Sequence, residues 1–436
     1  MAAGLNGADP ALILQQIAAR LHGFELDPFG AWLAQAALDL ALHDIAAAAG
    51  RPVPKIVEVR DSLDLKPADA GRFDLVIGNP PYGRAALPPD RRAFFKRGIY
   101  GHANLYGLFT DAALRWTRSG GLVAFVTPTS MLSGLYYKAL RRLLAKEAPP
   151  RFVSFVSERS GVFADALQET MLATYRRGDS TAAQGKVGFV SVDGSGRATT
   201  KDGGLFKLPE HREAPWLLPR TIDQIPLAQR LRSMRHRLSD YGYSVSTGPL
   251  VWNRHKNQLK QTDSAGAYPV VWAESVTSDG RFVWRSEKRN HAPWLDAKLP
   301  KDRWLIVTEP CVLLQRTTAK EQARRLIAAE MPEFFVRKHK GVAVENHLNM
   351  VRALGRSPSV SPAAVAALLN CAVVDSAFRC INGSVAVSAF ELEQLPLPPP
   401  DVMAKLAALV TAGASVQAIE TVVAAAYGRN NAAAFA

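Results

Sequence analysis

The stretch Phe73-Asp74-Leu75-Val76-Ile77-Gly78-Asn79-Pro80-Pro81-Tyr82 decides the fold class of this chain. Its first six residues form a short run rich in apolar and β-branched side chains, which predicts a buried strand. The two prolines that follow fix φ and remove two backbone donors, so the strand must end there. In open α/β sheets ligands bind beyond the carboxyl ends of the strands. We therefore expect the tetrapeptide Asn79 to Tyr82 to lie at a ligand site.

The sequence on both sides of this stretch repeats the strand pattern. Between His22 and Arg177, short apolar runs alternate with segments of helical periodicity, which predicts βα units on a largely parallel sheet. We read Gly120 and Gly121 as a helix C-cap before a strand. Expected strands are 22–26, 55–59, 73–77, 122–126, 152–156 and 170–175, and expected helices are 10–21, 29–48, 104–118 and 136–146.

The rest of the chain differs in composition from this α/β region. Residues 1–178 are expected to form the first domain, and residues 179–239, rich in Gly, Ser, Thr and Pro, a linker. Residues 240–400 show short β-like runs and a basic helical stretch near 320–329, which predicts a second, mixed α/β domain. Three prolines at 398–400 precede an Ala-rich segment, so we expect a C-terminal helix within 401–436.

The charge balance points to a polyanionic partner. The 436 residues include 53 Lys and Arg against 39 Asp and Glu, a formal charge of +14. Residues 241–360 hold 19 basic and 11 acidic side chains, whereas residues 1–100 hold 11 of each. Nucleic acid is the partner that such a regional excess favours.

Cysteine usage and hydropathy predict a soluble protein of a reducing cytoplasm. Cys311, Cys371 and Cys380 are odd in number and have no CxxC or Cys/His ligand spacing. No window approaches the roughly 18 uninterrupted apolar residues of a membrane span. We expect no metal site, because His347 and Glu345 are too isolated to hold zinc.

The tetrapeptide has a definite chemical capacity. The prolines leave carbonyl groups and the side chain of Asn79 as a rigid set of hydrogen-bond acceptors beside the ring of Tyr82. Such a set can bind a planar amine. A tight Pro-Pro turn that merely closes a strand is the structural alternative.

Together with its strand context, this tetrapeptide resembles the one in N6-adenine DNA methyltransferases of restriction-modification systems, with motifs in the gamma order. The resemblance implies a Rossmann-like S-adenosylmethionine-dependent methyltransferase sheet and a mixed α/β target-recognition domain. It also implies that Asn79 and Pro80 accept hydrogen bonds from the amino group of a flipped-out adenine. Pro81 completes the motif and Tyr82 stacks on the base, which must leave the duplex to react.

Further segments resemble the cofactor-binding and base-stacking motifs of this family. The resemblance assigns Glu25, at the end of an expected strand, to the ribose hydroxyls of S-adenosylmethionine. It assigns Asp61 to the cofactor adenine, with Ser62 in the same segment and Asn79 also near the cofactor. Asp27, before Pro28, fits a helix N-cap better than a ligand. Phe163 is the expected second aromatic against the flipped base, although a core position is the alternative.

One family segment is not found in this sequence. The family pattern begins with a strand and a glycine-rich loop that approaches the methionine end of the cofactor, and neither precedes Glu25 here. We therefore expect an N-terminally incomplete sheet. Three explanations remain open: a start codon placed too far downstream, a split enzyme whose second polypeptide supplies the glycine loop, or a degenerate remnant.

The second domain resembles the target-recognition region of the same family. Arg254, Lys256 and Arg316 are the side chains we expect to contact DNA phosphates. Double-stranded DNA and a cognate restriction endonuclease are the partners that the resemblance implies. Two alternatives stay open beside site-specific DNA methylation: a truncated or split subunit that binds DNA without methylating it, and a methyltransferase acting on RNA or on protein glutamine.

Overall fold

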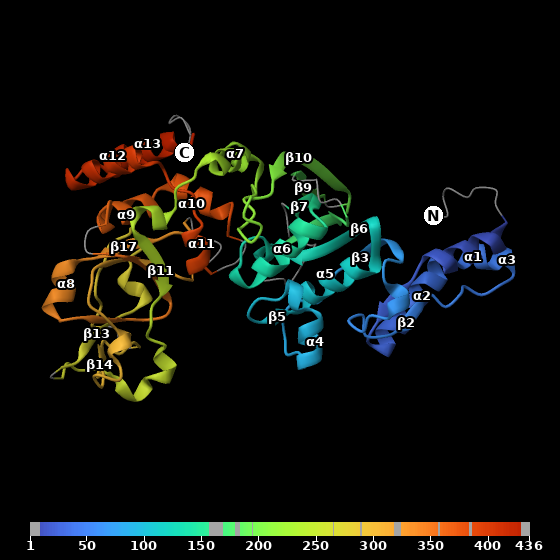
Figure 1. The fold of residues 1–436 in the computed structure, drawn as a ribbon, viewed down its shortest axis with the longest axis horizontal. Coiled ribbons are helices and arrows are strands. Elements are labelled where there is room, and N and C mark those ends of the chain that lie inside the picture. The colour runs from blue at the N-terminus through green and yellow to red at the C-terminus, as the bar shows by residue number, and fades with distance from the viewer. Residues whose placement is uncertain are drawn as a thin grey trace.

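The computed structural model of the chain describes residues 9–156, 169–178, 184–193, 195–264, 266–287, 290–317, 324–355, 358–382 and 386–428. Its secondary-structure elements follow one another along an elongated molecule (Figure 1). A small N-terminal unit lies at one end, a large sheet occupies the middle, and the elements from β11 onward form the other end.

The N-terminal unit contains a two-stranded parallel sheet covered by helices. Gly23 pairs with Val57 and Glu25 with Val59. Asp27 is the N-cap that the sequence predicts, because its side chain accepts from Gly30 N at 2.8 Å. The helix expected over 29–48 is divided at Leu42. The elements are α1 (Pro10–Arg20), β1 (Gly23–Glu25), α2 (Pro28–Ala41), α3 (His43–Ala49) and β2 (Val57–Val59).

A six-stranded mixed sheet forms the centre of the molecule, in the order β10-β9-β7-β8-β6-β3. Strand β3 pairs in parallel with β6, and β7 pairs in parallel with β9. This sheet confirms the strands expected at 73–77, 122–126, 152–156 and 170–175. Its strands are β3 (Phe73–Gly78), β6 (Thr117–Pro128), β7 (Pro150–Val156), β8 (Thr170–Arg176), β9 (Gln184–Val192) and β10 (Ala198–Lys207).

Helices α5 (Leu105–Trp116) and α6 (Lys138–Glu147) lie close to where the sequence predicts them. Their buried side chains join the core formed by one face of the sheet, which includes Val123 and Tyr175. The segment between β3 and α5 contains β4 (Arg84–Ala85), α4 (Pro89–Phe94), the 3-10 turn η3 (Lys96–Gly98) and β5 (Ala103–Asn104).

The expected linker over 179–239 differs from what the structure shows. Strands β9 and β10 extend the central sheet, and α7 (Ile225–Ser233) follows. Some glycines of this segment make room for aromatic rings of the sheet. A Cβ at Gly185 would lie 2.6 Å from the ring of Phe206, and one at Gly188 would lie 2.7 Å from the ring of Phe152.

The second half contains two more sheets. One has the order β11-β19-β16-β17, with β11 (Tyr243–Thr247), β16 (Cys311–Gln315), β17 (Ala328–Met331) and β19 (Leu348–Ala353). The other has the order β12-β14-β13-β18-β15, with β12 (Leu259–Lys260), β13 (Tyr268–Val271), β14 (Trp294–Leu295), β15 (Ile306–Val307) and β18 (Val342–Val344). Helix α8 (Glu333–Lys338) lies between β17 and β18 in the chain.

Two expectations for local structure are wrong. The basic helix near 320–329 is absent from residues 324–329, where the chain enters β17 and pairs with β16; residues 318–323 lie outside the described residues. Helix α5 ends at Trp116 with Thr117 as its C-cap, so Gly120 and Gly121 do not cap it. They lie within β6, where Gly120 has a φ of +79°.

The C-terminal helices complete the core of the second half. Together with α7 and the four-stranded sheet they form one cluster of buried apolar side chains. The single helix expected within 401–436 is two helices, broken after Thr411. These two helices are α12 (Pro400–Thr411) and α13 (Val416–Ala426). The other C-terminal helices are α9 (Pro362–Leu369), α10 (Ala372–Arg379) and α11 (Ala389–Glu393).

No single helix among the described residues is long and apolar enough to cross a membrane. Helices α9 and α10 satisfy the length and composition criteria only as a pair, which is bent by 68°. Both contribute buried side chains to the cluster just described. The three cysteines are buried free thiols.

A buried polar contact joins the central sheet region to the C-terminal helices. Ser133 Oγ donates a hydrogen bond to Glu391 Oε1 at 2.5 Å, and Asn382 Nδ2 donates to Glu391 Oε2 at 2.7 Å. Burial raises the pKa of Glu391 above its usual range, although these hydrogen bonds favour the ionised form. The protein therefore holds a carboxyl group whose protonation is coupled to folding.

The pKa of Glu391 predicts a pH-dependent stability. Because the folded-state pKa is raised, the contribution of Glu391 is most favourable below the unfolded pKa of about 4.3 and falls as pH rises through the folded pKa. Glu391→Gln should remove this dependence. The unfolding free energy of the natural chain minus that of the variant should fall with pH by up to about 1.4 kcal/mol per unit within that window.

Denaturant unfolding at several pH values between 4 and 8 measures this difference. Ser133→Ala removes a hydrogen bond to the ionised form, so it should raise the folded pKa further and extend the fall to higher pH. A difference between the natural chain and Glu391→Gln that stays constant with pH would contradict the prediction.

Candidate active site

The tetrapeptide lies directly after β3, as the sequence predicts, at the carboxyl end of a strand in the central sheet. Pro80 is buried, Asn79 and Pro81 are exposed, and Tyr82 is half-buried. The Tyr82 hydroxyl donates to Asn79 Oδ1 at 3.1 Å and lies 3.4 Å from the carbonyl oxygen of Val126 on β6. Burial raises the pKa of this hydroxyl. The hydroxyl group of Tyr82 thus fixes the position of the Asn79 amide oxygen.

Glu25 ends β1 next to the first turn of α2. Its Oε1 accepts a hydrogen bond from the backbone N–H of Asp27 at 3.0 Å. A Cβ at Gly30 would lie 3.2 Å from Glu25 Cγ, so the missing side chain allows helix and carboxylate to approach closely. The local structure holds this carboxylate at the end of its strand.

Asp61 lies just beyond β2 and is bound from two sides. Its Oδ1 accepts from Leu63 N at 2.8 Å, and its Oδ2 accepts from Arg91 Nη1 at 2.8 Å. Burial raises the pKa of Asp61, but these two hydrogen bonds outweigh it, so the pKa lies below its usual range. Asp61 is therefore a stable anion. Ser62, the next residue, is half-buried.

Sequence reasoning missed two arginines near Asp61, of which Arg91 binds it directly. Arg91 comes from α4, and no motif connects it with residue 61. Arg60 is buried; its guanidinium donates to Asp69 Oδ2 at 2.5 Å and lies 4.6 Å from the centre of the Phe24 ring. The signal for Arg60 is its place directly after a β-branched run, because an arginine at a strand end needs partners when it is buried.

The structure brings some of the predicted residues together. Glu25 and Asp61 lie at the same end of two paired strands, and Arg60 N donates to the carbonyl oxygen of Glu25 at 2.7 Å. Asn79 belongs to the other sheet. The two sheets meet through Phe24, whose ring is 6.3 Å from that of Phe73 and 5.6 Å from that of Trp116. The predicted base-stacking residue Phe163 lies outside the described residues.

The two carboxylates form a set of hydrogen-bond acceptors that fits the adenosine end of S-adenosylmethionine. Carboxylates at strand ends can accept hydrogen bonds from ribose hydroxyls and from an adenine amine. Glu25 and Asp61 meet this chemical requirement, although the Asp61 oxygen that faces Arg91 would have to share that partner. In the described part of the chain, no group of three or more His, Cys, Asp or Glu side chains could hold a metal ion.

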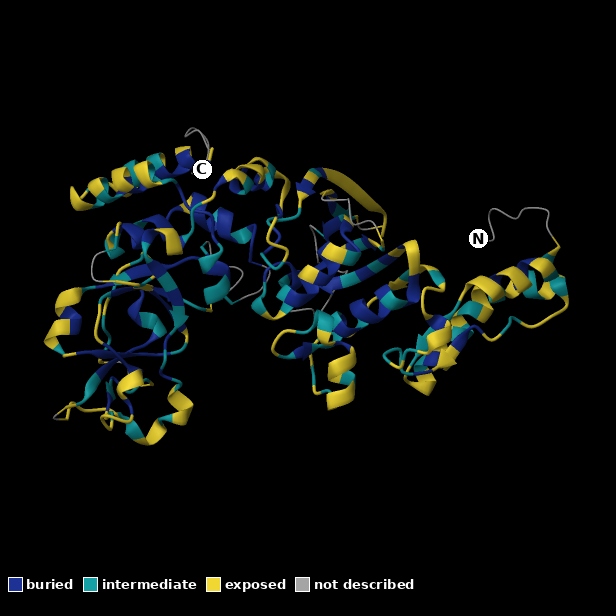
Figure 2. Ribbon diagram, viewed as in Figure 1, coloured by how far each residue is buried: buried dark blue, intermediate teal, exposed yellow. Residues whose placement is uncertain are grey.

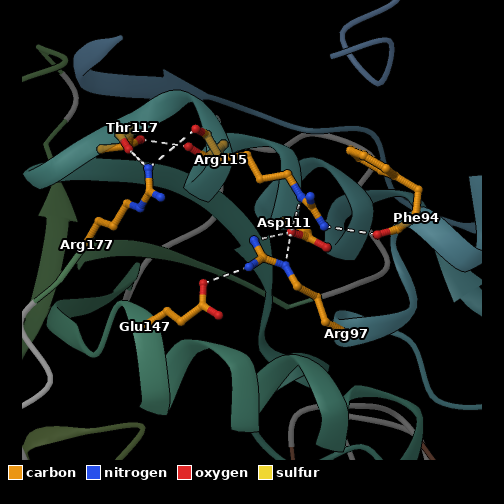
Figure 3. A network of polar contacts seen from close by, with 8 residues as sticks. Phe94, Arg97, Asp111, Arg115, Thr117, Glu147 and Arg177 are labelled. Carbon is orange, nitrogen blue, oxygen red and sulfur yellow. Dashed lines mark hydrogen bonds and ion pairs between the residues drawn. The ribbon is translucent and has the colours of Figure 1, made fainter. Parts of the chain in front are cut away.

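A buried ionic network fixes the segment that leaves the tetrapeptide (Figure 3). Asp111 on α5 is almost completely buried and accepts from Arg97 Nε at 2.7 Å and from Arg115 Nε at 3.0 Å. Arg97, in η3, also donates to Glu147 of α6 at 2.8 Å. The guanidinium of Arg97 therefore ties the chain that follows Tyr82 to both α5 and α6.

Removal of this buried charge should be costly. Asp111→Asn replaces the buried carboxylate shared by Arg97 and Arg115 with a neutral amide, and we expect the unfolding free energy to fall by about 3 kcal/mol, as for other broken buried ion pairs. Arg118→Gln is the matched control, because it breaks the exposed pair with Asp74 and should change stability by about 1 kcal/mol or less. Denaturant unfolding measures both, and equal losses would contradict the prediction.

The residues expected to contact DNA lie in the second half of the chain. Arg254 and Lys256 are exposed, and the Lys256 ammonium group lies 5.2 Å from the centre of the Trp252 ring. Arg316 is half-buried, and its guanidinium donates to the carbonyl oxygen of Asn346 at 3.1 Å. Arg254 and Lys256 are therefore available to a partner, whereas Arg316 already has a role in the fold.

Comparison with known proteins identifies the segment that carries the tetrapeptide. Residues 45–163 match the model of the Eco57I restriction-modification methylase family. This segment is therefore similar to the methylase domain of restriction-modification enzymes. The matched segment includes Asp61 and the tetrapeptide from Asn79 to Tyr82, while Glu25 precedes it.

Longer relatives extend the likeness beyond this domain. Type II methyltransferase M.PstI of Providencia stuartii is 26% identical over 338 residues, which are 75% of this chain and 65% of the relative. Type II methyltransferase M.BsuBI of Bacillus subtilis is 24% identical over 351 residues, 79% of this chain and 69% of the relative. The chain thus spans about two thirds of the length of these relatives.

A solved structure supports the fold of both halves. The Type IIL restriction-modification enzyme MmeI, solved in complex with DNA, superposes with a TM-score of 0.53 at 14% sequence identity. The superposition covers 94% of this chain and 64% of MmeI. This likeness confirms the predicted α/β fold class, with one sheet region followed by a mixed α/β region.

Proposed function

We propose that this chain transfers a methyl group from S-adenosylmethionine to N6 of an adenine flipped out of a specific DNA sequence. The observation that carries the proposal is the tetrapeptide from Asn79 to Tyr82 at the carboxyl end of β3, inside the matched methylase segment. The relatives are Type II methyltransferases, whose names specify methyl transfer but not the base that is methylated. The choice of adenine N6 is ours, and it rests on the acceptor chemistry of the tetrapeptide.

The chain's own residues have distinct roles in this reaction. Asn79 Oδ1 and the carbonyl of Pro80 accept the two amino hydrogens of adenine, which keeps the nitrogen lone pair out of the ring and raises its nucleophilicity. Tyr82 packs against the extruded base and offsets part of the cost of unstacking. S-adenosylmethionine, when bound, supplies the electrophilic methyl group, and Glu25, Asp61 and Ser62 hold its ribose and adenine end.

DNA recognition belongs to the second half in this proposal. Residues 240–400 form the target-recognition domain, where Arg254 and Lys256 contact phosphates and Arg316 supports the surface from within. A cognate restriction endonuclease is the expected functional partner, and the cytoplasm is the expected location. We keep the predicted functional units, which are residues 1–178, 240–400 and 401–436. In the structure, β9 and β10 also belong to the sheet of the first unit.

A second candidate function is favoured by the open sheets of the first half. Among the described residues, no strand pairs with both β1 and β3, so the two sheets are not joined by a backbone ladder. The chain would then be one subunit of a split methyltransferase, with the glycine loop supplied by a second polypeptide. Such a subunit binds DNA but does not methylate it alone.

Asn79→Ala tests the proposed chemistry. Loss of an acceptor that orients and activates the adenine amine should lower methyl transfer to duplex DNA at least about 100-fold. Tyr82→Phe is the matched control, because it keeps the ring and removes only the hydroxyl that now binds Asn79, so it should retain most of the activity. Incorporation of labelled methyl groups into DNA measures both variants.

Two results separate the candidates. An Asn79→Ala variant with more than a tenth of the natural rate would overturn the role of the tetrapeptide. A natural chain that binds DNA yet transfers no methyl group, and binds no S-adenosylmethionine in calorimetry, would favour the split subunit instead.

The salt dependence of DNA binding tests the recognition domain. Arg254→Ala should reduce the slope of log Kd against log salt by about 1, because one phosphate contact and its released counterion are lost. Lys405→Ala is the control, an exposed basic residue on α12 outside the proposed DNA surface. Fluorescence anisotropy with labelled duplex DNA gives both slopes, and equal slopes would remove Arg254 from the interface.

A further inference from the structure

The segment that follows the tetrapeptide carries a local concentration of positive charge. Residues 84–97 hold five basic side chains and one acidic one, although the first 100 residues hold equal numbers of each. Arg84, Arg92 and Lys96 are exposed. Strand β4, which begins at Arg84, starts two residues after Tyr82. Positive charge therefore lies beside the candidate site as well as in the second half of the chain.

The base of this segment is fixed, whereas its outer surface is open to solvent. Phe95 is only 1% exposed, and Arg97 is held by Asp111 and Glu147. Five of the six residues of α4 are exposed, and Figure 2 draws most of this helix in that class. The exposed cations are thus mounted on an anchored piece of backbone, and a cluster of one sign of charge attracts a polyanion.

Helix α4 projects toward the same side of the molecule as part of the second half. Figure 1 draws α4 and β14 on this common side. Strand β14 pairs with β12, which begins three residues after Lys256, one of the residues proposed to contact phosphates. A DNA duplex carries phosphates along its whole length, so both basic surfaces can contact one duplex.

Arg91 connects the basic segment with a proposed cofactor residue. Its Nη1 donates to Asp61 Oδ2 at 2.8 Å. The side chains of Arg91 and Asp61 are 39% and 33% exposed, so an external anion can reach this ion pair. A guanidinium group offers several N–H donors and binds phosphate oxygens in the same way as carboxylate oxygens. A phosphate beside α4 would therefore compete with Asp61 for Arg91.

We propose that Arg84, Arg91, Arg92 and Lys96 form a DNA-backbone surface and that Arg91 is shared between Asp61 and a DNA phosphate. The inference rests on the proposed function, because DNA and S-adenosylmethionine are its ligands. A phosphate that engages Arg91 weakens the hold of Arg91 on Asp61 and leaves this carboxylate freer to accept the cofactor amine. By linkage, the cofactor and DNA then increase each other's affinity by the same factor.

Two carboxylates test the sharing of Arg91 without any cofactor. Asp61→Asn releases Arg91, so the slope of log Kd against log salt for duplex DNA should increase by up to about 1. Asp64→Asn is the matched control, because it removes the same charge from an exposed position three residues away and leaves the ion pair with Arg91 in place. The double variant Asp61→Asn with Arg91→Gln should lose the increase. Fluorescence anisotropy gives all three slopes.

A pair of lysines tests the surface itself. Lys96→Gln should reduce the slope by about 1, because one phosphate contact is lost. Lys55→Gln should leave the slope unchanged, since this exposed lysine precedes β2, whereas Asp61 follows it.

Calorimetry tests the coupling between the two ligands. S-adenosylmethionine should bind the natural chain at least about 5-fold more tightly when a saturating duplex is present. Arg91→Gln should bind the cofactor with the same affinity with and without the duplex, because the shared group is gone.

The outcomes separate this inference from the proposed function. Equal slopes for Asp61→Asn and Asp64→Asn, or for Lys96→Gln and Lys55→Gln, overturn the inference, while DNA and cofactor binding by the natural chain leave the proposed function standing. A natural chain that binds no DNA overturns both. A chain that binds DNA but no cofactor overturns the proposed cofactor site and the coupling. Circular dichroism and the unfolding midpoint show that each variant keeps its fold.

Discussion

The parallel pairing of β3 with β6 is the interaction on which the candidate site depends. It sets Ile77 opposite Ala124 and Gly78 opposite Phe125, so the chain leaves the sheet at Asn79. The same pairing brings Tyr82 within reach of the carbonyl of Val126 on β6. A shift of this register by one residue would turn every side chain of β3 to the other face. The site is thus fixed by a backbone ladder rather than by its own side chains.

The two proposed cofactor carboxylates are held in a different way. Glu25 and Asp61 belong to a two-stranded sheet that forms no backbone ladder with β3 in the described part of the chain. Their position relative to Asn79 depends on side-chain contacts, namely the packing of Phe24 against Phe73 and Trp116 and the ion pair of Asp61 with Arg91. Packing of rings tolerates more variation in angle and distance than a ladder of hydrogen bonds does. The relative placement of the two halves of the proposed site is accordingly its least constrained feature.

The sequence predicted those parts of the fold in which local pattern and tertiary environment agree. The strand at 73–77 and the N-cap at Asp27 follow from apolar periodicity and from helix-start chemistry, and the structure confirms both. The linker expected over residues 184–207 is wrong because these residues form β9 and β10, in which Gly185 and Gly188 make room for rings of neighbouring strands, and no local pattern reveals this. The sequence did not predict the contact between Arg91 and Asp61 for a related reason. Arg91 is thirty residues away from Asp61 and reaches it only when α4 has formed.

The hydrogen bond from Tyr82 to Asn79 has a consequence for substrate selection. The amide oxygen of Asn79 has two lone pairs, and the phenol occupies one of them. A second donor can therefore approach this oxygen only from the remaining direction. The resting contact thus restricts the orientation of a bound amine relative to the ring of Tyr82.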